Sequence, residues 1–151
     1  MSATVESIVR APRPEAPSAQ DMADAAMVLN LASVKLRFGN MQGAADLLYL
    51  ADWLHPRHPP ILQKLAIALI EQGKDDQSVA VLNTLIGLTP KQPAAAGDWR
   101  MIGRLLIQLG MSDEARRALR YSRSLRGDAQ SAGDHDGVKV HRLARAASVV
   151  D

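Results

Sequence analysis

Apolar residues recur every three or four positions along much of the chain, and glycine or proline interrupts the pattern at regular points. The first such stretch starts at Asp21, places Met27, Leu31 and Val34 at helical intervals, and stops at Gly39. Apolar residues at this spacing line one face of a helix. Aspartate is a common residue at the start of a helix and glycine at its end. The pattern therefore predicts a helix that Asp21 caps and that ends before Gly39.

The stretch that follows Gly39 predicts a second helix ending at Pro56, and the same arrangement then occurs again. The interval from Gly39 to Gly73 equals the interval from Pro56 to Pro90. A third unit comes after the linker 91–97 and ends at a glycine rather than a proline. We predict three units of two helices, at about residues 25–56, 59–90 and 96–127.

Each unit pairs small residues with larger apolar ones. Small residues are expected where the two helices of one unit come closest, which are Ala32 and Ala44, Ala66 and Ser78, and Gly103 and Ala115. Larger apolar residues are expected to fill the spaces between helices: Leu31, Leu48, Leu54, Leu65, Leu82, Leu88, Ile102, Leu119 and Leu125. Both sets predict a core of closely packed helices.

The two ends of the chain differ from the repeated part. Residues 1–20 carry three prolines and little apolar pattern, which predicts a flexible leader. After a polar stretch rich in Gly and Asp, the segment 138–149 is amphipathic again. We interpret residues 137–149 as a capping helix, with a frayed basic tail as the alternative, and residues 21–150 as one domain.

Composition supports an all-α fold. The chain has 151 residues, of which 47% are hydrophobic and only 3% aromatic, and Ala and Leu are abundant. Leucine and alanine favour helices, whereas sheet cores are rich in β-branched and aromatic residues. Cysteine is absent, which excludes disulfides and thiol chemistry. We found neither a signal peptide nor an apolar run of about 20 residues, so we expect a cytoplasmic protein with no direct membrane insertion.

The residues that could act in catalysis or bind a metal do not form a known catalytic motif. No GxSxG motif or phosphate-binding glycine loop is present. The side chains of His55, His58 and the Asp-His-Asp stretch 134–136 are of types that bind metals, but we interpret them as polar turn residues because neither group joins a second cluster. We therefore expect no enzyme activity, no metal site and no cofactor.

The net charge is +2 and the positive charge is concentrated late in the chain. Five arginines lie close together in the third unit: Arg116, Arg117, Arg120, Arg123 and Arg126. Such a cluster attracts acidic partners or nucleic acid, but most charged helix faces are simply solvated. We interpret the cluster as a solvated face and expect no nucleic-acid partner, with nucleic-acid binding kept as a minor alternative.

A unit of helix, turn and helix that recurs at an interval of about 34 residues resembles the tetratricopeptide pattern. The resemblance implies three hairpins stacked into a right-handed superhelix, in which the first helix of each pair lines a concave groove for a peptide. The residues of the first helices that point away from their second helix are the predicted partner-binding residues. They are Leu29, Ser33, Leu36 and Arg37; Gln63, Ile67 and Ile70; and Arg100, Arg104 and Ile107.

The segments "ADLLYLADWLHPRHP", "LAIALIEQGKDDQSVAVLNTLI" and "GDWRMIGRLLIQLGMSDEARRALRYS" are similar to the small three-repeat chaperones of type III secretion, the export-apparatus chaperone most of all. The needle-subunit and translocator chaperones are also similar. The resemblance implies a non-enzymatic chaperone that holds a small secreted client and delivers it to an export component, as a hetero-complex or a homodimer. A general scaffold for protein interactions is the alternative.

Overall fold

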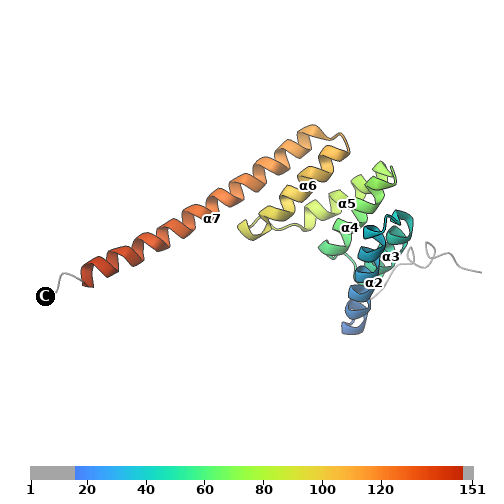
Figure 1. The fold of residues 1–151 in the computed structure, drawn as a ribbon, viewed down its shortest axis with the longest axis horizontal. Helices are drawn as coiled ribbons and strands as arrows, with labels where there is room; N and C mark the ends of the chain where they lie inside the picture. The colour runs from blue at the N-terminus through green and yellow to red at the C-terminus, as the bar shows by residue number, and fades with distance from the viewer. Residues whose placement is uncertain (1–15, 148–151) are drawn as a thin grey trace, which may run out of the picture. The chain divides into compact units, whose positions relative to one another are not determined.

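The computed structural model describes the backbone of residues 16–147 and the side chains of residues 16–131, and all its regular elements are helices (Figure 1). In chain order they are α2 (Ala19–Arg37), α3 (Met41–Leu54), α4 (Pro59–Glu71), α5 (Asp75–Leu88), the 3₁₀ helix η1 (Pro93–Ala95), α6 (Ala96–Gln108) and α7 (Ser112–Ala147). The chain divides into two compact units, each larger than a predicted helix pair or equal to one. The first unit contains α2 to α5, which are the first two hairpins, and the second unit contains η1, α6 and α7. We call these two parts the first unit and the second unit from here on. The predicted all-α class and the helix hairpins are confirmed.

Ser18, rather than Asp21, caps the first helix. The backbone N–H of Asp21 donates to Ser18 Oγ at 3.1 Å, and the Ser18 N–H donates to Asp21 Oδ2 at 2.9 Å. This reciprocal capping box stabilises the first helical turn. Helix α2 therefore starts at Ala19, and the last two residues assigned to the leader are helical. Residues 1–15 lie outside the described part of the chain.

Glycines end the first helix of each hairpin, as the spacing of the repeats predicted. Gly39, Gly73 and Gly110 have φ values of 78°, 71° and 75°. This left-handed conformation is unfavourable for residues with a Cβ and common just after a helix. Pro59 starts α4, where its fixed φ suits the first turn. These residues set the helix boundaries locally.

The small residues predicted at the helix crossings of the first unit are buried. Ala32 on α2, Ala44 on α3, Ala66 on α4 and Ser78 on α5 are all fully buried. The Ser78 hydroxyl donates to the carbonyl oxygen of Ala66 at 3.2 Å. A small residue on each helix allows such a direct contact between one helix and the backbone of the other. This hydrogen bond confirms the predicted pair Ala66–Ser78; the close approach of Ala32 and Ala44 stays a prediction that their burial supports.

Five of the nine larger apolar residues are buried as predicted, three (Leu54, Leu88 and Leu119) are half-buried, and Leu31 is exposed. Leu48, Leu65 and Leu82 are at most 1% exposed, whereas Leu31 is 51% exposed. Helix α2 buries the face that carries Ala25 and Ala32 instead. The helices found in contact with α2 are α3 and α4. The prediction for Leu31 was wrong because burial also requires a neighbour on that side of the helix.

The second unit repeats the hairpin packing with different side chains. A Cβ on Gly103 would lie 2.7 Å from Leu119 Cγ, so only glycine fits here without a shift. The Trp99 ring meets Tyr121 edge to face at 5.0 Å, and its Nε1–H donates to the Pro90 carbonyl oxygen at 3.0 Å. The Ser122 hydroxyl donates to the Ala96 carbonyl oxygen at 2.7 Å. The contacts of Tyr121 and Ser122 join α7 to α6, and the hydrogen bond from Trp99 joins α6 to the segment before η1.

Helix α7 does not end at Gly127, where the sequence predicted the end of the third hairpin. It continues to Ala147 and includes most of the predicted capping segment 137–149, whose last two residues lie outside the described part. A glycine inside a helix costs only about 1 kcal/mol relative to alanine, and no proline interrupts α7. The prediction that a separate helix begins at residue 137 was therefore wrong. Whether this segment caps the third hairpin stays a prediction.

Candidate functional site

Seven predicted partner-binding residues lie on two helices of the first unit that contact each other, α2 and α4. We call them the first-helix face: Leu29, Ser33, Leu36 and Arg37 on α2, and Gln63, Ile67 and Ile70 on α4. Arg37 is exposed and the other six are half-buried. The structure therefore brings these seven residues to neighbouring helices and leaves part of each accessible.

Four of the seven residues of the first-helix face are aliphatic and half-buried. Leu29 and Leu36 pack with one side against the buried core of the unit, so their positions are fixed by the fold. The Ser33 hydroxyl donates to the Leu29 carbonyl oxygen at 2.8 Å, which satisfies its donor within the helix. Arg37 adds a positive charge at the end of α2. Such a surface suits an apolar peptide segment or an amphipathic helix.

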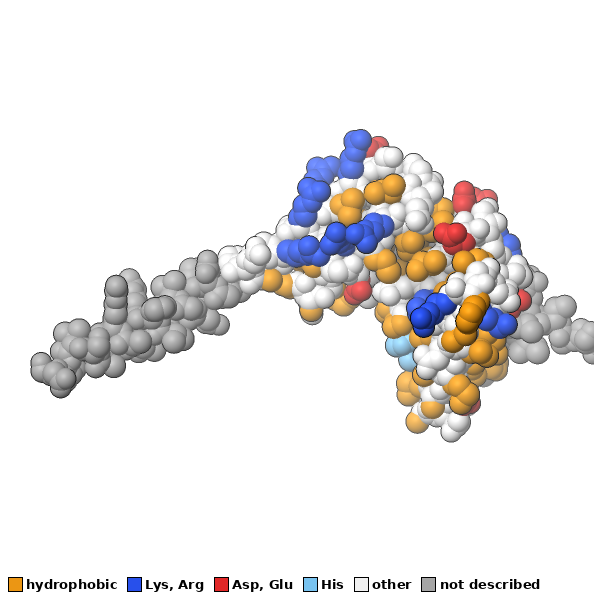
Figure 2. Space-filling model, in the orientation of Figure 1, with side chains coloured by type: hydrophobic (Ala, Val, Ile, Leu, Met, Phe, Trp, Pro, Cys, Tyr) orange, Lys and Arg blue, Asp and Glu red, His pale blue; other side chains and the backbone are white. Residues whose placement is uncertain are grey.

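The other three predicted residues belong to the second unit. Arg100, Arg104 and Ile107 are exposed on α6, at spacings of four and three residues that place them on one side of the helix. Helix α7 adds exposed arginines, and Figure 2 shows basic side chains gathered over the second unit. Arg116 forms an exposed ion pair with Asp113 at 3.8 Å, and pairs of this kind contribute little to stability.

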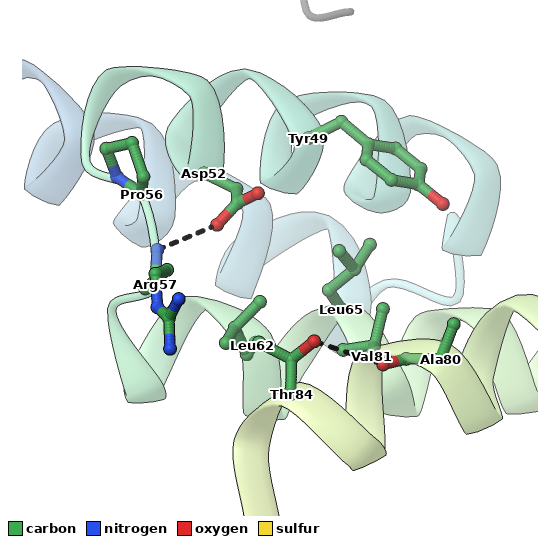
Figure 3. A pocket seen from close by; sticks show the side chains of 9 residues that line it. All are labelled: Tyr49, Asp52, Pro56, Arg57, Leu62, Leu65, Ala80, Val81 and Thr84. Carbon is green, nitrogen blue, oxygen red and sulfur yellow. Dashed lines mark hydrogen bonds between the residues drawn. The ribbon is translucent and has the colours of Figure 1, made fainter. Parts of the chain in front are cut away.

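The sequence did not indicate a pocket of about 260 Å³ among α3, α4, α5 and the turn after α3 (Figure 3). Its walls are mainly apolar, although four of its nine lining residues carry a polar group. It is lined by Tyr49, Asp52, Pro56 and Arg57, by Leu62 and Leu65, and by Ala80, Val81 and Thr84. This volume is slightly below the usual range of small-molecule sites, so the pocket suits a single inserted side chain better than a cofactor.

Asp52 is the acidic residue of the pocket, and its main contact is with the turn. The Arg57 N–H donates to Asp52 Oδ1 at 3.3 Å (Figure 3). Arg57 has φ of 59°, an uncommon conformation for a residue with a side chain, and the hydrogen bond helps to hold it. Burial raises the pKa of the Asp52 carboxyl above its usual 3.8, and the Arg57 hydrogen bond opposes this shift.

Replacing Asp52 tests whether its charge or its hydrogen bond matters. A raised pKa in the folded state means that stability falls as pH rises through the folded-state pKa. We therefore expect Asp52→Asn, whose amide oxygen still accepts from Arg57, to be at least as stable as the parent at pH 7. This difference should vanish below the unfolded pKa, at about pH 3. Thermal melts at both pH values measure it.

Asp52→Ala serves as the comparison because it removes the acceptor as well as the charge. We expect it to lose about 1 kcal/mol at pH 7, the usual contribution of one hydrogen bond. Equal losses in the Asn and Ala variants at pH 7 would mean that the carboxylate charge itself stabilises the fold, contrary to this interpretation.

The histidines of the same turn stack on each other. The His55 and His58 rings are 4.2 Å apart between centroids, with 17° between their planes. Burial, and to a lesser degree the proximity of His55, lower the pKa of His58. Among the described side chains, no three His, Cys, Asp or Glu residues gather as a candidate metal site. The stacked pair lies at the turn between α3 and α4, His55 at the end of α3 and His58 before the start of α4.

The pocket residues gave no signal in the sequence because they come from three helices and a turn. Arg57 follows a proline and precedes a histidine, and neither neighbour predicts a positive φ. Asp52 was the one lining residue whose position in the sequence could have pointed to the pocket. It lies in the last turn of α3, where a negative charge is unfavourable because it is near the helix C-terminus. An acidic residue there indicates a compensating donor in the following turn.

Residues 35–97 match the family model described as tetratricopeptide repeat. The matched segment includes all of α3, α4 and α5 and supports the tetratricopeptide identification of the repeats. Repeats of this family typically act as non-catalytic scaffolds for protein interaction. No curated protein matches the chain. Within the described residues, none of the helices has the length and hydrophobicity needed to cross a membrane.

Proposed function

We propose that this chain is a non-enzymatic chaperone that binds a segment of a small protein client on the first-helix face. One observation carries the proposal: Leu29, Leu36, Ile67 and Ile70 remain partly exposed on two helices in contact, although they are aliphatic. Burying apolar surface contributes roughly 25 cal/mol per Å². A client segment with apolar side chains on one side would cover this face and gain that free energy.

The client class follows from the resemblance to the type III secretion chaperones. In this proposal the client is a small secretion substrate, and the chaperone keeps its apolar segment from aggregating in the cytoplasm before an export component takes it over. A surface that is apolar and only partly charged suits this task, because it binds a segment that would otherwise be exposed. Arg100, Arg104 and Ile107 in the second unit are proposed as further contacts.

A general scaffold for protein interactions is the second candidate. The matched family model describes the repeat alone, and such repeats serve many kinds of partner. A scaffold would bind several short peptides weakly, whereas a chaperone would form a stable complex with one client. The number and the affinity of the partners therefore distinguish the two candidates.

The test is to purify the tagged full-length chain from its native cytosol at low and high salt and to identify what remains bound by mass spectrometry. The chaperone proposal predicts one small secreted protein, retained at both salt concentrations in a fixed ratio. Several weakly held proteins would favour the scaffold. Nucleic acid that is retained at low salt and lost at high salt would instead point to the arginines of α7, since phosphate contacts weaken steeply with salt.

A further inference from the structure

The pocket beside Asp52 uses a different side of α4 from the first-helix face. All its lining residues belong to the first unit. On α4 the pocket is lined by Leu62 and Leu65, whereas the first-helix face uses Gln63, Ile67 and Ile70. At 3.6 residues per turn, the two sets lie on different sides of the helix. A ligand in the pocket would therefore leave the first-helix face accessible.

The inner walls of the pocket are aliphatic. Leu62 and Leu65 are buried and Val81 is half-buried, whereas Ala80 and Thr84 are exposed and so lie at the mouth. An aliphatic chain that enters between them would exchange water for apolar contacts, which is favourable. These walls therefore suit the stem of a side chain rather than a polar group.

A carboxylate faces these aliphatic walls. Figure 3 shows the Asp52 side chain directed toward the space that Leu62 and Leu65 line. Its Oδ1 accepts from the Arg57 N–H, and among the described residues no other donor or cation pairs with the carboxylate, the exposed Arg57 guanidinium included. Burial raises the pKa of Asp52, which means that the carboxylate has lost hydration that this hydrogen bond does not replace. Its second oxygen, Oδ2, can therefore accept from a ligand.

The hydroxyls of the pocket offer acceptors rather than donors. The Tyr49 hydroxyl donates to Gln77 Oε1 at 3.1 Å, and the Thr84 hydroxyl donates to the Ala80 carbonyl oxygen at 3.2 Å. A hydroxyl has a single hydrogen, so in this arrangement each of them can only accept from a ligand. The pocket therefore favours a ligand group that donates hydrogen bonds.

A lysine side chain combines the two properties that the pocket requires. Its methylene stem suits the aliphatic walls, and its ammonium carries three donors and a positive charge. A plain aliphatic side chain would bury Asp52 without a partner for the carboxylate, which is costly. Arginine fits less well because its planar fork binds both oxygens of a carboxylate, and Oδ1 is already used by the Arg57 N–H. An ammonium needs Oδ2 alone.

We propose that the pocket beside Asp52 binds a lysine side chain of a protein partner. The stem lies against Leu62, Leu65 and Val81, and the ammonium donates to Asp52 Oδ2. A protein is the source of the lysine because the helices that form the pocket match the tetratricopeptide model, and such repeats typically bind proteins. The site does not depend on the proposed client, since no residue of the first-helix face lines it.

NMR titration of the full-length, methyl-labelled chain tests this site. The probes are Nα-acetyl-lysine N-methylamide and the norleucine and arginine compounds with the same caps; norleucine has a similar stem without the ammonium. We expect the lysine probe to shift the methyl signals of Leu62, Leu65 and Val81 with a dissociation constant in the millimolar range. The norleucine probe should bind about tenfold more weakly, the usual effect of losing a hydrogen bond to a charged group. The arginine probe should also bind more weakly than lysine.

Two variants separate the pocket carboxylate from general charge attraction. Asp52→Asn removes the charge and keeps an oxygen that accepts from Arg57, so it should bind the lysine probe no better than the norleucine probe. Asp46→Asn is the matched control, because it removes one charge from an exposed position of the same helix outside the pocket. It should keep the preference for lysine.

Several results would overturn the proposal. Norleucine or arginine binding as tightly as lysine would show that the pocket does not select an ammonium on an aliphatic stem. A lysine preference that persists in Asp52→Asn, or that is lost equally in Asp46→Asn, would show that the Asp52 carboxylate is not its source. Unshifted pocket methyl signals at tens of millimolar of the lysine probe would show that lysine does not bind there.

Discussion

Ala44→Trp is expected to unfold the first hairpin. Ala44 has no exposed surface, and the sequence predicts that it lies where α2 and α3 cross, opposite the equally buried Ala32. An indole there must push the two helices apart, and overpacking a core costs about 1–3 kcal/mol and sometimes more. For the largest side chain we expect at least about 3 kcal/mol, a large part of the total stability of a domain. Circular dichroism melts measure the loss of helicity.

Asp46→Trp is the matched control for Ala44→Trp. Asp46 lies further along the same helix and is exposed, and it accepts only a solvent-exposed hydrogen bond from Gln42. We expect it to melt close to the parent, because surface substitutions usually change stability by less than about 0.5 kcal/mol. Parent-like melting of Ala44→Trp would show that the helices can separate here without cost.

Leu36→Glu and Ile70→Glu are each expected to abolish binding of the client identified by purification. Both side chains belong to the first-helix face and are half-buried, so a carboxylate can turn toward solvent in the free protein. In the complex it would be buried against apolar client atoms without a partner, which costs several kcal/mol. We expect at least about 30-fold weaker binding, equivalent to about 2 kcal/mol. Isothermal titration calorimetry measures the affinity.

Asn83→Glu on α5 is the control for the charge itself, because Asn83 is exposed and lies outside the first-helix face. It should bind the client as the parent does. Circular dichroism must show parent-like helicity in all three variants, since Leu36 also contacts the core. If both Glu variants bind normally, the binding site lies elsewhere, and the pocket beside Asp52 becomes the next candidate.

The sequence predicted the helices well because their boundaries depend on local conformation. Gly39, Gly73 and Gly110 adopt the left-handed conformation, and Pro59 starts a helix, regardless of what packs nearby. The start of α2 was misplaced by less than one turn. Ser18 and Asp21 are both good caps, and the reciprocal hydrogen bonds of the capping box decide between them. The sequence offers both residues but does not rank them.

Helix α7 shows the limit of reading a helix end from composition. The polar stretch after Gly127 has residues of modest helix propensity, and the sequence pattern indicated a break there. Each such residue costs only a fraction of a kcal/mol in a helix, and glycine about 1 kcal/mol. Without a proline, these costs can be absorbed by continuous backbone hydrogen bonding, so α7 continues to Ala147.

The sequence by itself determined the repeat, the hairpins and the small residues at their crossings, since all of these depend on residue type and spacing within one unit. The tertiary structure alone decided which apolar positions are covered. Leu31 and Leu65 are the same residue type at equivalent positions of successive repeats, yet the first is half exposed and the second buried. The physical reason is that burial depends on a neighbouring helix, and α3 precedes α4 whereas no described helix precedes α2.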